Sequence, residues 1–86
     1  MEKKYSYTLC PEISNEVFID TCQKIEQRWP EFRKERLLID VDGTVLQIYY
    51  QGQNEVVVYN DVEVGAVYIE SDIDLDDLFG NLRLIR

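Results

Sequence analysis

Polar and apolar residues alternate at the start of the chain, over residues 3–9, and place Tyr5, Tyr7 and Leu9 on one face. This period of two is typical of a strand with one buried face. Pro11 interrupts the pattern, since a proline has no backbone N–H to give to a neighbouring strand. We therefore predict that the chain opens with a β-strand.

The next segment has the spacing of an amphipathic helix. Its apolar residues recur three or four positions apart: Phe18, Cys22, Ile25 and Trp29. Ser14 stands before them as a good N-cap, and Pro30 ends the helix because the residue before a proline is pushed out of the helical region. The pattern predicts one helix with a single apolar face for a sheet.

Beyond a short charged connection the period returns to two. The strand candidates are residues 36–41, 44–51, 55–60 and 62–70. The segments between them are rich in turn-forming residues: Asp42-Gly43, Gly52-Gln53-Asn54 and Asn60-Asp61. Connections this short force neighbouring strands to be antiparallel, so we expect a four-stranded meander.

Two of these turns predict a register. Asp42-Gly43 has the residues of a type I′ turn, which needs a positive φ at both central positions. A similar two-residue turn is expected at Asn60-Asp61. The cross-strand pairs that follow are Val41 with Thr44, Ile39 with Leu46, Tyr59 with Val62, and Val57 with Val64.

The last part of the chain predicts a short helix over about residues 72–79. Ser71 stands three residues before Asp74, as in a capping box with Asp in place of Glu, and Gly80 would end the helix. The chain is thus expected to be a single α+β domain, residues 1–86, with elements in the order β-α-β-β-β-β-α. The main helix is expected to pack on one face of the antiparallel sheet.

Composition narrows the possible chemistry. The 86 residues include no histidine, which excludes Ser-His and Cys-His nucleophile pairs. Cys10 and Cys22 are separated by eleven residues, a spacing that fits no zinc or redox motif, so we expect free thiols. The alternating aspartates from Asp72 onward resemble the start of a calcium-binding EF loop, but its sixth position is Asp77 rather than glycine. We expect no enzymatic activity, no cofactor and no metal site.

The segment 37-LLIDVDGTVLQ-47 resembles the nucleophile motif of haloacid-dehalogenase-type phosphatases, Asp-x-Asp-Gly-Thr after a hydrophobic strand. The resemblance implies Asp40 as the nucleophile and Asp42 as the acid/base, with a magnesium ion. That family has a larger domain with a parallel sheet and crossover helices, for which this chain has no room. A hairpin turn explains the same residues.

Charge is unevenly placed along the chain. Residues 1–36 carry seven bases and seven acids, and residues 37–86 carry ten acids and two bases, so the second part accounts for the whole net charge of −8. From Asp61 to Asp77 there are seven acids and no base. Such a field repels nucleic acid and anionic membranes and favours a basic partner, and an acidic surface also serves solubility. The chain shows neither a long apolar run nor a signal-peptide pattern, so we expect a cytoplasmic protein without a membrane segment.

These features predict a small acidic protein-binding module, an inhibitor or immunity-type protein that covers a basic surface of its partner. The partner would be a basic protein such as a nuclease toxin or a nucleic-acid-binding protein. Carboxylates would stand in for phosphates, and tyrosines would act as anchors. The predicted contact residues are Tyr49, Asp61, Glu63, Tyr68, Glu70, Asp72, Asp74, Asp76 and Asp77.

Two alternatives remain open at the level of the sequence. One is a non-catalytic accessory or adaptor domain that self-associates as a homodimer through a sheet edge, since a strand such as 55-EVVVYN-60 invites pairing. The other is the small metal-dependent phosphatase that uses Asp40 and Asp42. The order of elements also resembles that of cystatin-type inhibitors, but their Gln-x-Val-x-Gly loop is missing at 47-QIYYQG-52, so this likeness assigns no functional residue.

Overall fold

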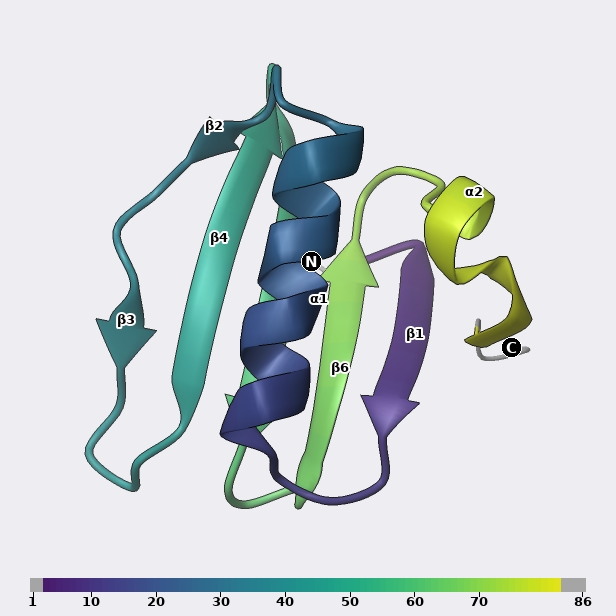
Figure 1. Cartoon of the computed structure of the whole chain (residues 1–86). Coiled ribbons are helices and arrows are strands. Elements are labelled where there is room, and N and C mark those ends of the chain that lie inside the picture. Colours follow the sequence, from purple (N-terminus) through teal and green to yellow (C-terminus); the bar gives the residue numbers. More distant parts are fainter. Residues whose placement is uncertain (1–2, 83–86) are drawn as a thin grey trace.

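The computed structural model describes residues 3–82. Its elements are β1 (Tyr5–Cys10), α1 (Asn15–Arg28), β2 (Arg33–Lys34), β3 (Leu38–Ile39), β4 (Val45–Gln51), β5 (Asn54–Asp61), β6 (Ala66–Ser71), α2 (Asp76–Phe79) and the 3-10 helix η1 (Gly80–Leu82). The strands form one antiparallel sheet in the order β1-β6-β5-β4-β2, and β3 also pairs with β4. Helix α1 crosses one face of this sheet, and α2 lies beyond β1 (Figure 1). The predicted α+β fold is confirmed, and in residues 3–82 no helix has both the length and the apolar character needed to cross a membrane.

Helix α1 begins and ends where its sequence predicts. The hydroxyl of Ser14 accepts a hydrogen bond from the amide of Val17 at 3.1 Å, as an N-cap does. Phe18, Cys22 and Ile25 are buried against the sheet, and the helix ends before Pro30. The apolar stripe of α1 is therefore its docking face.

The core lies between α1 and the sheet face that it covers. Pairing places Tyr49, Val56 and Ser71 in one row across β4, β5 and β6, and Gln47, Val58 and Ile69 in the next. The buried apolar side chains of the core are Tyr7, Phe18, Cys22, Ile25, Phe32, Tyr49, Val56, Val58, Val67, Ile69, Leu75 and Phe79. No described helix covers the opposite face of the sheet, which we call the open face (Figure 1).

Tyr49 is the buried polar link between the sheet and the helix. Its side chain is 1% exposed, and its hydroxyl donates a hydrogen bond of 2.6 Å to the Glu26 carboxylate. Burial opposes ionisation of Glu26, but the hydrogen bonds from Tyr49 and Lys34 outweigh it and hold the pKa of this carboxyl below its ordinary value. The bond therefore stabilises the fold above the ordinary carboxyl range, and its contribution is lost as the pH falls through the lowered pKa.

The variant Tyr49→Phe tests this link. We expect it to lower the free energy of unfolding by about 1–2 kcal/mol at neutral pH, since a buried hydrogen bond to a charged group is lost. The measurement is urea unfolding followed by circular dichroism. Tyr50→Phe is the matched control, because Tyr50 lies on the open face, and its effect should stay within about 0.5 kcal/mol. Equal effects of the two substitutions would contradict the assignment.

The turn between β4 and β5 is confirmed. Gln51 lies opposite Asn54, so the loop consists of two residues, and Gly52 has a φ of 61°. A positive φ at the first central position is typical of a type II′ turn, one of the two tight turns that suit hairpins.

The turn between β3 and β4 is a hairpin, but its loop has three residues. The amide of Asp40 donates to the carbonyl of Thr44 at 2.8 Å, and the amide of Gly43 donates to the carbonyl of Asp40 at 3.1 Å. Gly43 has a φ of 92°, whereas Asp42 has no positive φ. This is a type I turn followed by a glycine in the left-handed region, so the predicted type I′ turn is wrong. The Asp42 carboxylate favours this form, because it accepts a hydrogen bond from the amide of Thr44 at 2.9 Å.

The extra loop residue changes the register of the edge strand. Ile39 lies opposite Val45 rather than Leu46, and Val41 leaves the ladder for the tip of the turn. The predicted strand 36–41 and its pairs are therefore wrong. Two short pieces, β2 and β3, pair with β4 in registers that differ by one residue, so the chain bulges over residues 35–37.

The hairpin between β5 and β6 is also longer than predicted. Asp61 pairs with Ala66, so residues 62–65 form a four-residue loop. The predicted two-residue turn at 60–61, its cross-strand pairs and the start of a strand at residue 62 are wrong. Strand β5 is central, with β4 and β6 on its two sides, so the segment 55–60 has no edge at which a second copy could pair.

The C-terminal part departs from the prediction in its caps. Ser71 is the buried last residue of β6, and its hydroxyl bonds to the backbone of Ile73 rather than capping a helix. Helix α2 begins only at Asp76, and Gly80 continues in right-handed helical geometry into η1. The capping box, the helix over 72–79 and its stop at Gly80 are therefore wrong, although a short helix is present.

Gly43→Val tests the loop of the β3–β4 hairpin. A β-branched residue is strained at a φ of 92°, so we expect a loss of more than about 1 kcal/mol in the free energy of unfolding. An added Cβ would meet only Val62 within 4 Å, at an ordinary contact distance of 3.7 Å, so backbone strain is the expected cause. The control is Gln53→Val, an exposed turn position without a positive φ. Thermal melts that match wild type for Gly43→Val would contradict this geometry.

Candidate functional site

The predicted contact residues do not share one surface. They separate into a core residue, a group on and around α2, and a group on the open face and the β5–β6 loop. Most of these residues are close in sequence, and for that reason they were predicted to form one surface, but the fold places them in different parts of the molecule.

Tyr49 is not a surface residue. Its position in a half-buried strand left open which way the ring points, and the structure turns it into the core, 1% exposed. A partner could contact it only if α1 separated from the sheet. Tyr49 is therefore removed from the set of possible contact residues.

The acids from Asp72 to Asp77 are engaged within the fold. Asp72 accepts a hydrogen bond of 2.8 Å from the amide of Glu55, and Asp74 accepts one of 2.7 Å from the amide of Asp76. The hydroxyl of the buried Tyr7 donates a hydrogen bond to the Asp76 carboxylate at 2.8 Å, and Asp77 forms an ion pair with Arg28 of α1. These carboxylates hold the C-terminal segment on the rest of the molecule.

Tyr68 and Glu70 lie on the open face. The Tyr68 ring stacks on Tyr59 of the neighbouring strand with centroids 4.6 Å apart. Glu70 stands two residues further along β6, on the same side, because side chains of a strand alternate between the two faces. These two predicted residues are half-buried and remain within reach of a partner.

Asp61 joins the open face to the β5–β6 loop. Its carboxylate accepts a hydrogen bond from the Tyr68 hydroxyl at 2.7 Å. It also accepts hydrogen bonds from the backbone amides of Glu63 and Val64 at 3.0 and 3.1 Å. The Tyr68 hydrogen bond, supported by the two amides, holds the pKa of the Asp61 carboxyl below its ordinary value despite partial burial. The stability that this provides is present above the ordinary carboxyl range and is lost as the pH falls through the lowered pKa.

Asp61→Asn should therefore reduce stability most at neutral pH. We expect a loss of about 1–2 kcal/mol at pH near 7 and a smaller loss under acid conditions, where the wild-type carboxylate is also protonated. The comparison requires urea unfolding at both pH values. Glu63→Gln removes the same charge from an exposed position in the same loop and should leave the unfolding midpoint nearly unchanged. A loss for Asp61→Asn that does not depend on pH would show that the carboxylate charge is not the cause.

A surface that the sequence did not predict lies at the end of the molecule where α1 begins. The loop before α1, the β3–β4 turn and the β5–β6 loop meet there, at the bottom of Figure 1. Exposed apolar side chains come from all three segments, and we call them the apolar tip: Ile13 (51% exposed), Ile39 (70%), Val41 (103%), Val62 (43%) and Val64 (64%).

Hydrogen bonds hold the three segments of the apolar tip together. The amide of Ser14 donates to the side chain of Asn60 at 3.1 Å, and Asn60 in turn donates to Asn15 at 3.1 Å. The amide of Val62 donates to the Thr44 hydroxyl at 3.0 Å, which joins the two hairpin turns. The apolar side chains are thus displayed on a fixed frame.

Every charged residue in the loops of the apolar tip is an acid. Residues 5–23 and 37–82 contain no Lys or Arg, and every loop of the tip lies in these ranges. The acids contributed by these loops and by the first turn of α1 are Glu12, Glu16, Asp40, Asp42, Asp61 and Glu63. The bases of the described residues lie in the segments before residue 5 and between residues 24 and 36, towards the opposite end of the molecule (Figure 1).

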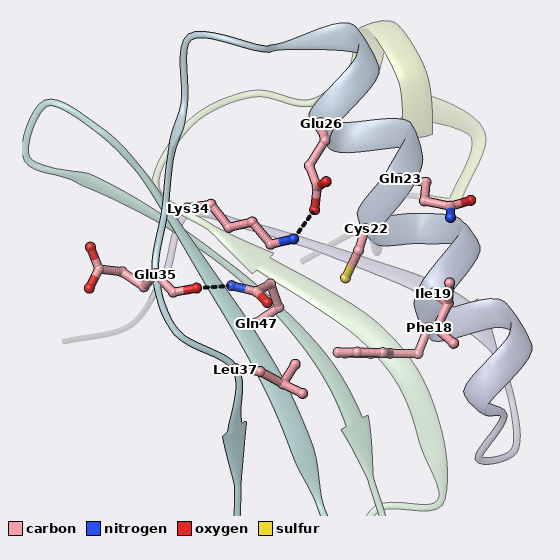
Figure 2. A pocket seen from close by; sticks show the side chains of 9 residues that line it. All are labelled: Phe18, Ile19, Cys22, Gln23, Glu26, Lys34, Glu35, Leu37 and Gln47. Atoms are coloured by element: carbon pink, nitrogen blue, oxygen red, sulfur yellow. Dashed lines mark hydrogen bonds and ion pairs between the residues drawn. The ribbon is translucent and has the colours of Figure 1, made fainter.

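A groove of about 520 Å³ lies beside this tip, between α1 and the bulged edge strand. Its lining residues are Phe18, Ile19, Cys22, Gln23, Glu26, Lys34, Glu35, Leu37 and Gln47. Figure 2 shows that the ion pair between Lys34 and Glu26, at 3.0 Å, bridges the edge strand and the helix at one end of the groove. Burial raises the pKa of the Cys22 thiol, so this sulfur is an apolar part of the wall rather than a reactive thiolate.

Asp40 and Asp42 both bond to the backbone of the β3–β4 turn. Their carboxylates accept hydrogen bonds from the amides of Val41 (2.7 Å) and Thr44 (2.9 Å), and both side chains are exposed at the hairpin tip. Within residues 3–82 no three His, Cys, Asp or Glu side chains are arranged to share a metal ion. The two aspartates act as turn residues and as acids of the tip.

Comparison with known proteins gave no relative: no family model, no curated protein and no solved structure matches the chain. The surface therefore has to be interpreted from its own chemistry. One feature of the sequence could have indicated this acidic surface, namely the absence of Lys and Arg from residues 5–23 and 37–82. The exposure of the valines could not be predicted, because it depends on hairpin loops that are longer than their turn residues indicated.

Proposed function

We propose that this protein is a small protein-binding module that covers a basic surface of a partner protein, in the manner of an inhibitor or an immunity protein. The observation that carries the proposal is the apolar tip, where exposed Val and Ile side chains lie on loops that carry acids and no base. A surface of this kind pairs hydrophobic burial with electrostatic selection of a basic partner.

The two parts of the surface have different tasks. Each apolar side chain that is fully buried by a partner contributes about 1.5–3 kcal/mol, so the tip supplies the larger share of affinity. Acids at the rim of an interface contribute little to affinity individually, but they raise the association rate and exclude acidic partners. The molecule measures 30 × 29 × 26 Å, so one end of it offers a contact area of the usual size, about 800 Å².

A basic partner fits this surface better than a second copy does. Two tips that face each other would bring together only negative charges, which costs free energy in a desolvated contact. The edge pairing of residues 55–60 that favoured a homodimer is also absent, because β5 is central. A protein with exposed Lys or Arg around an apolar patch meets both requirements.

Substitutions at the tip test the proposal. We expect Val41→Gln with Val64→Gln, and separately Asp40→Asn with Asp42→Asn, to reduce capture of basic proteins by the immobilised protein from a cell lysate. Asparagine keeps the oxygen that accepts the turn hydrogen bonds, so the second pair of changes removes charge and preserves the fold. Capture by wild type should fall between about 0.1 M and 1 M salt, as the Debye length decreases from about 10 to 3 Å.

Asp74→Asn with Asp77→Asn is the matched control, since it removes the same charge away from the tip. Quantitative mass spectrometry of the captured proteins should show no change for this control. A set of partners that resists salt and is equally retained by the tip variants would refute the proposal.

A further inference from the structure

The sheet extends further than the helix that covers it. Helix α1 lies over the central strands, and β3 stands beside it with no helix above it on that side (Figure 1). Ile39 faces the same side as α1, because it pairs with Val45 in a row that continues to Asn60 and Val67. Leu37, two residues before Ile39, lines the groove with Phe18. An apolar strip on the helix side of the edge thus remains exposed.

The groove has the shape and chemistry of a helix site. Figure 2 shows Leu37 and Phe18 on opposite sides of the opening, with the Cys22 sulfur directed into it. Ile19, on the exposed flank of α1, is 54% exposed, and Leu37 is 45% exposed. The floor is sheet, one wall is helix, and the other wall is the bulged strand, which is the space where a second helix beside α1 would pack in a two-layer fold.

We propose that an amphipathic, basic helix of the partner packs in this groove alongside α1. This rests on the proposed function, since it names the partner segment that the surface receives. The apolar stripe of that helix contacts Ile19, Leu37 and Ile39. Its Lys and Arg side chains face the acids of the neighbouring tip, such as Asp40 and Asp42.

A helix fits better than an added strand. Strand addition needs a continuous row of free backbone groups, but β2 and β3 contain two residues each and change register between them. The Gln47 side chain occupies the break, where its amide donates to the carbonyls of Glu35 (2.5 Å) and Ile48 (3.3 Å). This edge therefore presents apolar side chains to a partner, and it lacks the continuous row of free backbone groups that strand addition requires.

Charge selects the partner helix. The groove is closed at one end by the Lys34–Glu26 pair, which is internally neutral, and it opens towards the tip, whose loops carry acids and no base. The only long helix among residues 3–82 has its apolar stripe buried in its own core, so a second copy has no free helix to offer. The occupant is therefore a segment of a different, basic protein.

Defined peptides test this with the full chain. The probe is a Leu/Lys peptide of about 14 residues, about 21 Å as a helix, with Leu at i, i+3, i+4 and i+7. A peptide of the same composition with strictly alternating Leu and Lys, and one with scrambled order, are the comparisons. We expect the helical pattern to bind most tightly by fluorescence titration, and its amide chemical-shift changes to include Ile19, Leu37 and Gln47.

Adjacent leucines give the decisive comparison. Leu37→Gln should weaken binding of the helical peptide by about tenfold, which corresponds to about 1.4 kcal/mol. Leu38→Gln changes the same residue type one position away, on the open face, and should leave the affinity unchanged. Tighter binding of the alternating peptide, no binding of the helical one, or equal effects of the two substitutions would each overturn the helix site. Dependence on Val41 and Val64 but not on Leu37 would overturn it while leaving the proposed function in place.

Discussion

The packing of one helix on a sheet of six strands is the constraint on which the rest of the structure depends. Helix α1 has 14 residues and a diameter of about 10–12 Å, whereas strands lie about 4.8 Å apart, so it covers only the middle of the sheet. The short α2 and η1 cover the side of β1. The far edge at β3, the apolar tip and the open face are left to solvent or to a partner.

Several of the acidic side chains stabilise the fold itself by accepting hydrogen bonds. Hydroxyls of four tyrosines donate to carboxylates: Tyr7 to Asp76, Tyr49 to Glu26, Tyr50 to Glu55, and Tyr68 to Asp61. Two of these bonds connect segments that are distant in sequence: Tyr7 of β1 bonds to Asp76 of α2, and Tyr49 of β4 bonds to Glu26 of α1. Carboxylates are thus the acceptors for these four phenol hydroxyls, and two of them, Asp61 and Asp76, belong to the acidic segment from Asp61 to Asp77.

The sequence predicted the elements better than their ends. Helix α1 could be predicted because Ser14, a helical apolar stripe and Pro30 all agree, and each acts locally. The two hairpin loops could not, because Asp42 and Asp61 stabilise longer loops through side-chain hydrogen bonds to amides that follow them. A difference of one residue in a loop then reverses which side chains of the edge strand face the core.

The predicted site was affected by the same limit. Charge along the chain identified an acidic region, but it could not distinguish carboxylates that bond within the fold, such as Asp76, from those that are exposed. Tyr49 was uncertain for the same reason, since a strand alternates its faces and only tertiary pairing decides which is inside. The apolar tip arises from three segments that are far apart in sequence, and no local pattern brings them together.

Among residues 3–82 the bases lie away from the acids of the apolar tip, and this separation of charge contributes an electric dipole. Under the proposed function, the field of a basic partner would favour orientations in which the acidic tip points towards it, so that encounters would begin with the apolar side chains facing the partner. Most collisions between two proteins are misoriented and do not lead to binding. A polarised charge distribution raises the fraction of productive collisions without adding a contact. For the proposed partner, the absence of Lys and Arg from residues 5–23 and 37–82 would thus act on the rate of association as much as on the affinity.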